Sequence, residues 1–172
     1  MNQRLMVYLT DLIHRRLGKP LTNPEDLQRL RLAVEDAKLN LTSHEATPIN
    51  VSLPSLGDKI LFQETLTRNT FEKINADLFD KVLQPIKQVL TDVEMRPDEI
   101  DEVVLVGGST RIPRVRQVVA EYFGKEPNIA IDPELAVAYG VAIQAGIIGG
   151  MWPLQVSAIE LTNRRVRKVN VQ

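Results

Sequence analysis

Two adjacent glycines and a nearby arginine form the segment of this sequence best suited to bind a ligand. Gly107 and Gly108 follow a short apolar run, 102–106, whose β-branched residues are typical of a buried, parallel strand. Ligands of open α/β sheets bind at the carboxyl ends of such strands, where glycines let the backbone approach without Cβ clashes. The loop leads into a helix beginning at Pro113, whose free N–H groups suit phosphate, and Arg111 could stack on a base.

The residue pattern alone leaves a second interpretation open. The loop is neither a GxGxxG fingerprint nor a Walker A loop, so the same residues also suit a tight turn with a surface arginine. A second candidate set, Glu35, Lys38 and Thr42, is spaced by three and four residues and therefore projects from one helix face. The alternative interpretation is that Glu35 and Lys38 form only a solvated i,i+3 ion pair, worth a few tenths of a kcal/mol.

Composition excludes several classes of chemistry. The chain of 172 residues has no cysteine, which rules out disulfides, a thiol nucleophile and cysteine-ligated zinc. Two histidines cannot build a histidine-rich metal site, and a net charge of -1 gives no reason to expect nucleic acid or an anionic membrane as partner. We also expect no secretory signal, because charged residues interrupt the first 17 positions, and no transmembrane segment.

The first part of the chain predicts two helices followed by a β-hairpin. One helix spans about 3–17 and ends at Gly18, and a second begins at Asn23 as N-cap with proline at the first helical position. Alternating polarity from residue 49 to 62, interrupted by the turn signal at 55–58, predicts the hairpin. Thr67 can cap a further helical stretch that reaches about Val93 and bends near Pro85.

The second part predicts strands alternating with helices. After the strand at 102–106 come a helix from 113 to 124, a short strand at 128–131 and a helix at 133–148. The last helix is apolar on nearly every face, so we expect it to be packed on several sides. We therefore predict an α/β fold with a helical and hairpin subdomain at 1–75, a partial α/β subdomain at 76–150 and a tail at 151–172.

Several motifs in register resemble the ATPase domain of the seventy-kilodalton heat-shock protein family. The stretch Leu-Val-Gly-Gly-Ser-Thr-Arg-Ile-Pro at 105–113 matches the family's adenosine-binding signature. The stretch Asp-Pro-Glu-Leu-Ala-Val-Ala-Tyr-Gly at 132–140 is close to the family's Asn-Pro-Asp-Glu-Ala-Val-Ala-Tyr-Gly. The resemblance covers about residues 1–150. It implies the C-terminal half of an actin-like, ribonuclease H-like ATPase domain.

The narrower resemblance is to a microsome-associated branch of this family that has no peptide-binding domain. The segment Trp-Pro-Leu-Gln-Val-Ser-Ala at 152–158 is similar to it, as is Lys-Leu-Asn-Leu-Thr at 38–42. The hairpin turn near Ser55 is short here, where that branch carries a longer insertion. The resemblance implies an endoplasmic reticulum or microsomal location, with the cytoplasm left open.

The resemblance also implies a role for each candidate residue in binding ATP or ADP. Glu35 would accept hydrogen bonds from the ribose and Lys38 would donate to ribose or phosphate oxygens, while Thr42 would contact the base. The remaining contacts would be Gly107 and Gly108 on the phosphates and sugar, Ser109 on the adenine, Arg111 stacked on the adenine, Ile112 lining the pocket and Glu134 near the base.

Two departures from the family predict altered nucleotide affinity. Leu39 stands where the family has a second adenine-stacking arginine, which removes a cation–π contact worth about 0.5–2 kcal/mol. Glu134 replaces a family aspartate near the base. The phosphate loops and Mg²⁺-organising aspartates of the family have no counterpart in this sequence. We therefore expect a truncated domain that binds nucleotide without hydrolysing it alone, with Mg²⁺ held only through the missing half.

Two other functions remain open from the sequence. The chain could be a non-catalytic interaction module, because exchange factors in the family grip the subdomain corresponding to 1–75. A sugar kinase or actin relative would share the architecture, although the motif at 105–113 favours the chaperone branch. We further expect the segment 103–106 to be left as an unpaired apolar edge, which would make the second subdomain less stable than the first.

Overall fold

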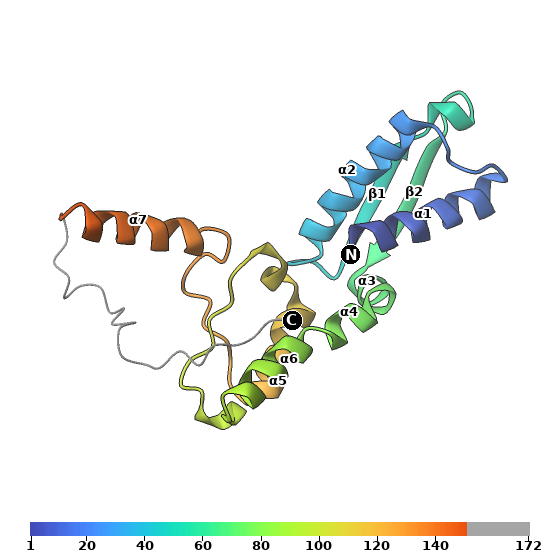
Figure 1. Cartoon of the computed structure of the whole chain (residues 1–172). Coiled ribbons are helices and arrows are strands. Elements are labelled where there is room, and N and C mark those ends of the chain that lie inside the picture. Colours follow the sequence, from blue (N-terminus) through green and yellow to red (C-terminus); the bar gives the residue numbers. More distant parts are fainter. Residues whose placement is uncertain (151–172) are drawn as a thin grey trace. The chain divides into compact units, whose positions relative to one another are not determined.

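The structure, a computed structural model, describes residues 1–150 (Figure 1). The chain divides into two compact units, Met1–Lys81 and Val82–Gln172, whereas the sequence pattern predicts a boundary after residue 75. Each unit is described by itself below. The predicted tail at 151–172 lies outside the described residues.

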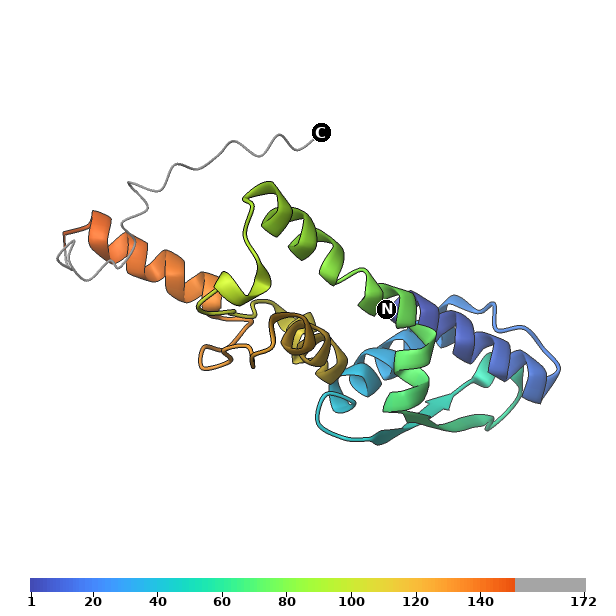
Figure 2. The same ribbon diagram turned by 90° about the horizontal axis from the view of Figure 1, so that it is seen from below.

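Unit 1 contains two long helices, a β-hairpin and two short helices. The helices α1 (Asn2–Leu17) and α2 (Pro24–Asn40) precede the strands β1 (Ala46–Ser52) and β2 (Leu61–Thr67), which are joined by a short 3-10 turn, η1 (Pro54–Leu56). The strands pair antiparallel, with Ala46 opposite Thr67 and Ser52 opposite Leu61. The helices α3 (Arg68–Ile74) and α4 (Ala76–Asp80) complete the unit, and Figure 2 shows α1 and α2 on the same side of the hairpin.

Local sequence signals determine where these elements begin and end. Gly18 adopts the left-handed conformation (φ 70°) that ends α1, because glycine has no Cβ to clash there. The side chain of Asn23 accepts hydrogen bonds from the first N–H groups of α2, and Thr67 caps α3 in the same way. The two predicted helices, their caps and the predicted hairpin are thus confirmed.

One apolar core holds unit 1 together. Residues on the inner faces of α1 and α2 and alternate residues of β1 are almost completely inaccessible to solvent, as the period of each element requires. The most deeply buried are Leu5, Leu9, Ile13, Leu30, Val34, Ile49, Leu53 and Leu66. All of these core residues belong to unit 1 itself.

The described part of unit 2 is mostly helical. It contains α5 (Leu83–Asp92), two short 3-10 turns, η2 (Pro97–Glu99) and η3 (Gly108–Arg111), then α6 (Pro113–Phe123) and α7 (Ala136–Ile148). The single helical stretch predicted from 67 to 93 is instead three helices, α3, α4 and α5. The predicted helix from Pro113 is confirmed, and it ends at Gly124 in the left-handed conformation (φ 64°).

The two strands predicted in unit 2 do not form as strands. Their pairing is limited to one parallel bridge, in which Asn128 donates its N–H to the Val103 carbonyl over 2.7 Å. The Ala130 N–H then turns to the side chain of Asn128 instead of a neighbouring strand. Val104 and Val106 are about half exposed, so this segment is an uncovered apolar edge, as expected.

The expectation that the last helix is packed on several sides is wrong for the described residues. Of the residues in α7, only Gly146 is buried, and Val137 and Val141 are 66% and 65% exposed. The apolar composition predicts the helix correctly, but burial depends on neighbouring elements. The described residues of unit 2 supply no element that covers α7.

Candidate functional site

The glycine pair forms the turn that connects the Val104 segment to α6. Gly107 has φ 98°, a conformation that residues with a Cβ rarely adopt. Its N–H donates to the Pro133 carbonyl over 2.7 Å, and its own carbonyl accepts from the N–H and the hydroxyl of Thr110. These bonds tie both ends of the turn, so the bare backbone of the glycine pair is held in one conformation.

Gly108 lies against the carboxylate of Glu134. A Cβ built on Gly108 would lie 2.8 Å from Glu134 Oε1, closer than van der Waals contact allows. The absence of a side chain at position 108 therefore lets a carboxylate approach the backbone of the turn. Gly107, in contrast, would meet no atom within 4 Å, and its requirement for glycine comes from the backbone angle alone.

Two carboxylates hold Arg111. One terminal nitrogen donates to both oxygens of Asp132, at 2.9 and 2.8 Å, and Nε lies 3.4 Å from Glu134 Oε2. Nε is buried and has no hydrogen bond among the described residues, because the approach of Glu134 is a charge contact without hydrogen-bond geometry. The pKa of Asp132 is lowered below its ordinary value, mainly by the hydrogen bond from the Glu134 N–H and to a smaller extent by the hydrogen bond from Arg111. This arrangement fixes the plane of the guanidinium.

The two other predicted residues of this loop have different environments. Ile112 is only 5% exposed and belongs to the small core that unit 2 forms with Val115 and Val119 of α6. Ser109 is exposed on the 3-10 turn. A ligand over this turn could therefore reach Ser109 directly, whereas Ile112 would act mainly by supporting the turn from below.

The predicted residues of unit 1 lie at the C-terminal end of α2. Lys38 Nζ donates to Glu35 Oε1 over 2.5 Å, and Asn2 of α1 also donates to the Glu35 carboxylate. Lys38 is the main cause of a lowered Glu35 pKa. The Thr42 hydroxyl donates to the Leu39 carbonyl over 2.7 Å. Both polar groups of the i,i+3 pair keep part of their surface in solvent, so they are available to a ligand.

The structure thus groups the nine predicted site residues into two sets. Gly107, Gly108, Arg111 and Glu134 contact one another or share partners in unit 2, and Ser109 and Ile112 belong to the same turn. Glu35 and Lys38 are paired in unit 1, with Thr42 in the turn that follows their helix.

Sequence reasoning missed two residues that organise these sets. Asp132 is not among the predicted site residues, yet it is the principal partner of Arg111 across 21 positions of sequence. Arg68 anchors the turn after α2 by donating to the carbonyls of Leu41 and His44, each over 2.9 Å. No periodic pattern links residues so far apart, so only opposite charge could have suggested the first of these pairs.

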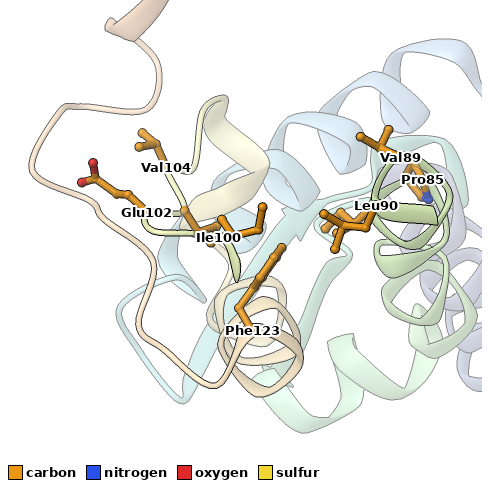
Figure 3. A pocket seen from close by; sticks show the side chains of 9 residues that line it. Pro85, Val89, Leu90, Ile100, Glu102, Val104 and Phe123 are labelled. Atoms are coloured by element: carbon orange, nitrogen blue, oxygen red, sulfur yellow. The ribbon is translucent and has the colours of Figure 1, made fainter. Parts of the chain in front are cut away.

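A separate apolar groove of about 380 Å³ lies between α5, the Val104 segment and α6 (Figure 3). Its lining includes Pro85, Val89 and Leu90 of α5 together with Ile100, Val104 and Phe123. Glu102 is its charged member. Because this lining offers no cationic side chain to a phosphate, the groove is not suited to a nucleotide, and the glycine turn remains the candidate site.

Residues 1–150 offer neither a metal site nor a membrane-spanning helix. No group of histidine, cysteine, aspartate or glutamate side chains there could hold a metal ion. No helix in this range is long and apolar enough to cross a bilayer.

Comparisons with known proteins give the family. The profile of the family described as Hsp70 protein matches residues 1–164. The chain therefore belongs to the Hsp70 family, as the motifs predicted, and the α/β class of its ATPase domain is confirmed.

Several similar relatives share one name. Heat shock 70 kDa protein 13 from Homo sapiens is 44% identical over 210 aligned positions, which cover 98% of this chain and 45% of the relative. The proteins of that name from Bos taurus and Mus musculus are 44% and 43% identical with the same coverage. The chain thus spans about half the length of these relatives. Because the alignment is longer than this chain, the relatives also carry residues in the matched region that this chain lacks.

Proposed function

We propose that this chain is an ATP- and ADP-binding lobe of a chaperone-type ATPase of the Hsp70 family, and that alone it binds nucleotide without hydrolysing it. The observation that carries the proposal is the turn at Gly107 and Gly108, whose bare backbone lies beside an arginine fixed by Asp132. Membership of the family supports it, because the matched region includes this turn.

The turn fits an adenine nucleotide in its chemistry. Glycines without side chains suit the close approach of a sugar and phosphates, and the exposed Ser109 can hydrogen-bond a base. The hydrogen bonds to Asp132 already fix the orientation of the Arg111 guanidinium. Stacking a base on its face would therefore cost little further side-chain entropy. Its buried, unbonded Nε is the kind of group that a ligand could satisfy.

The proposed contacts in unit 1 are polar. The Glu35 carboxylate, kept charged by Lys38, can accept from two ribose hydroxyls. Lys38 can donate to ribose or phosphate oxygens, and Thr42 can contact the base once its hydroxyl leaves the Leu39 carbonyl. None of the residues assigned here would activate a water molecule or hold Mg²⁺. The charge neutralisation that Mg²⁺ supplies in phosphoryl transfer is assigned to no residue of this chain.

Calorimetric titration of the whole chain with ADP tests the proposal. Replacing Arg111 by alanine removes the stacking surface, and a cation–π contact of about 0.5–2 kcal/mol corresponds to a loss of roughly 2- to 30-fold in affinity. Arg114→Ala is the matched control, because Arg114 lies in α6 close in sequence to Arg111, and its ion pair among residues 1–150 is with Glu121, at 3.9 Å. Equal affinity in all three proteins would place ADP elsewhere than on this turn.

A folded chain that binds no ADP would instead favour a non-catalytic interaction module. One observation supports that alternative: unit 1 closes its own core and could present its surface to an exchange factor or co-chaperone. A microsomal location is likewise part of the proposal, to be tested by fractionation of cells that express the whole protein.

A further inference from the structure

Glu134 occupies the part of the glycine turn that a phosphorylated ligand needs. Its Oε1 lies 2.8 Å from the position that a Cβ on Gly108 would take, and its Oε2 lies 3.4 Å from Arg111 Nε. The side chain is 59% exposed, so most of its surface contacts solvent and not protein. Its contacts with Gly108 and Arg111 therefore set the position of the carboxylate, and the exposed side chain has room to rotate away from both.

While Glu134 stays in place, the charges around the turn offer phosphate no net attraction, because two arginines are balanced by two carboxylates. Arg111 brings one positive charge, and it already faces the two negative charges of Asp132 and Glu134. A second cation, Arg116, donates from Nε to the Thr110 carbonyl over 2.8 Å, two residues beyond Gly108. A phosphate approaching Gly108 would meet a carboxylate first, whereas an uncharged nucleoside would meet no such repulsion.

We propose that Glu134 is a specificity-determining residue of this site, which disfavours phosphorylated adenine nucleotides relative to adenosine and leaves the Gly108 backbone when ADP binds. This inference rests on the proposed function, because it concerns the same turn. Removing a residue that contacts the ligand favourably would weaken binding. Removing the charge of Glu134 should instead strengthen the binding of ADP.

The experiment compares ADP with adenosine in four forms of the whole chain: unchanged, Glu134→Gln, Glu134→Ala and Glu126→Gln. Glutamine keeps the length and shape of the side chain but removes its charge. Glu126 is the matched control, since it is exposed beyond α6 and its side chain makes no hydrogen bond or ion pair within residues 1–150. Calorimetry at low and high salt gives four dissociation constants for each protein.

For Glu134→Gln we expect ADP affinity to rise about 2- to 5-fold at low salt, the range of an exposed charge interaction. Adenosine affinity should change less, and the gain for ADP should shrink at high salt because ions screen exposed charges. Glu126→Gln should match the unchanged chain. Glu134→Ala, which also clears the space beside Gly108, should show at least the gain seen with glutamine.

Two results would overturn the inference, and they differ from each other. If the unchanged chain binds ADP and Glu134→Gln binds ADP and adenosine with the same ratio of affinities, Glu134 does not discriminate between them, and the proposed function stands. If neither ligand binds to any of the folded proteins, the proposed function fails, and the inference fails with it.

Discussion

Asp26 connects the start of α2 to the tip of the hairpin, and its removal should destabilise unit 1. The side chain is only 1% exposed although it is a carboxylate. One oxygen accepts from the N–H of Ser55 over 3.0 Å and from its hydroxyl over 2.5 Å, and the other accepts from Arg29 over 2.5 Å. A buried carboxylate is tolerated only when it is bonded in this way.

The cost of Asp26→Ala follows from these partners. A hydrogen bond to a charged group contributes about 1.5–3 kcal/mol, and a donor left buried without a partner adds to the loss. Ser55 and Arg29 are both partly exposed, however, so water can replace some of the lost bonds. We therefore expect the free energy of unfolding of unit 1 to fall by about 2 kcal/mol.

The effect should depend on pH. Burial alone would raise the pKa of Asp26, but hydrogen bonds from Ser55 and Arg29 outweigh it and hold the pKa below its ordinary value. A lowered pKa in the folded state means that the stabilisation is complete above the unfolded-state pKa of about 3.9 and is lost as the pH falls through the folded-state pKa. The difference in free energy of unfolding between the unchanged chain and Asp26→Ala should therefore become smaller in acid.

Urea denaturation followed by far-ultraviolet circular dichroism measures the effect, and hydrogen exchange at the Ser55 amide reports it locally. Asp36→Ala is the matched control, because Asp36 is exposed on the same helix. Surface substitutions of that kind change stability by about 0.5 kcal/mol or less. If Asp26→Ala costs no more than Asp36→Ala at neutral pH, the bonds to Ser55 and Arg29 do not support the fold.

Three further outcomes are expected. Gly107→Ala should destabilise unit 2 by about 1–2 kcal/mol, because alanine is strained at a φ of 98°. An unchanged midpoint of urea denaturation would show that the turn relaxes to accept the new side chain. Arg4→Met should raise the Asp77 pKa from about 2 toward its ordinary value in an NMR titration, because the Arg4 hydrogen bond is the main cause of the lowering. Limited proteolysis should cut residues 82–150 before unit 1, since Val104 and α7 are exposed; equal protection of the two units would contradict this.

Much of unit 1 could be predicted from its sequence because its signals are local. An asparagine before a proline, a glycine after a run of helical residues and an alternation of polarity each act within a few positions of the chain. The structure places α1, α2 and the hairpin where those signals indicate. The family, too, was readable from motifs of consecutive residues.

Unit 2 shows why the remaining predictions could not be made with equal success. The segment 102–106 has the composition of a buried strand, but a strand exists only when neighbours pair with it along its length, and Val104 has a single bridge. The apolar residues of α7 favour burial in the same way, yet burial needs a covering element.

The sequence by itself determined the positions of the helices and the hairpin, the glycine turn and the family, because each depends on residues adjacent along the chain. Only the tertiary structure decided that Arg111 is held by Asp132, that Glu134 lies against Gly108 and that Asp26 binds the hairpin tip. Those contacts join residues more than twenty positions apart. Their geometry depends on how the intervening chain folds back, and no local propensity encodes it.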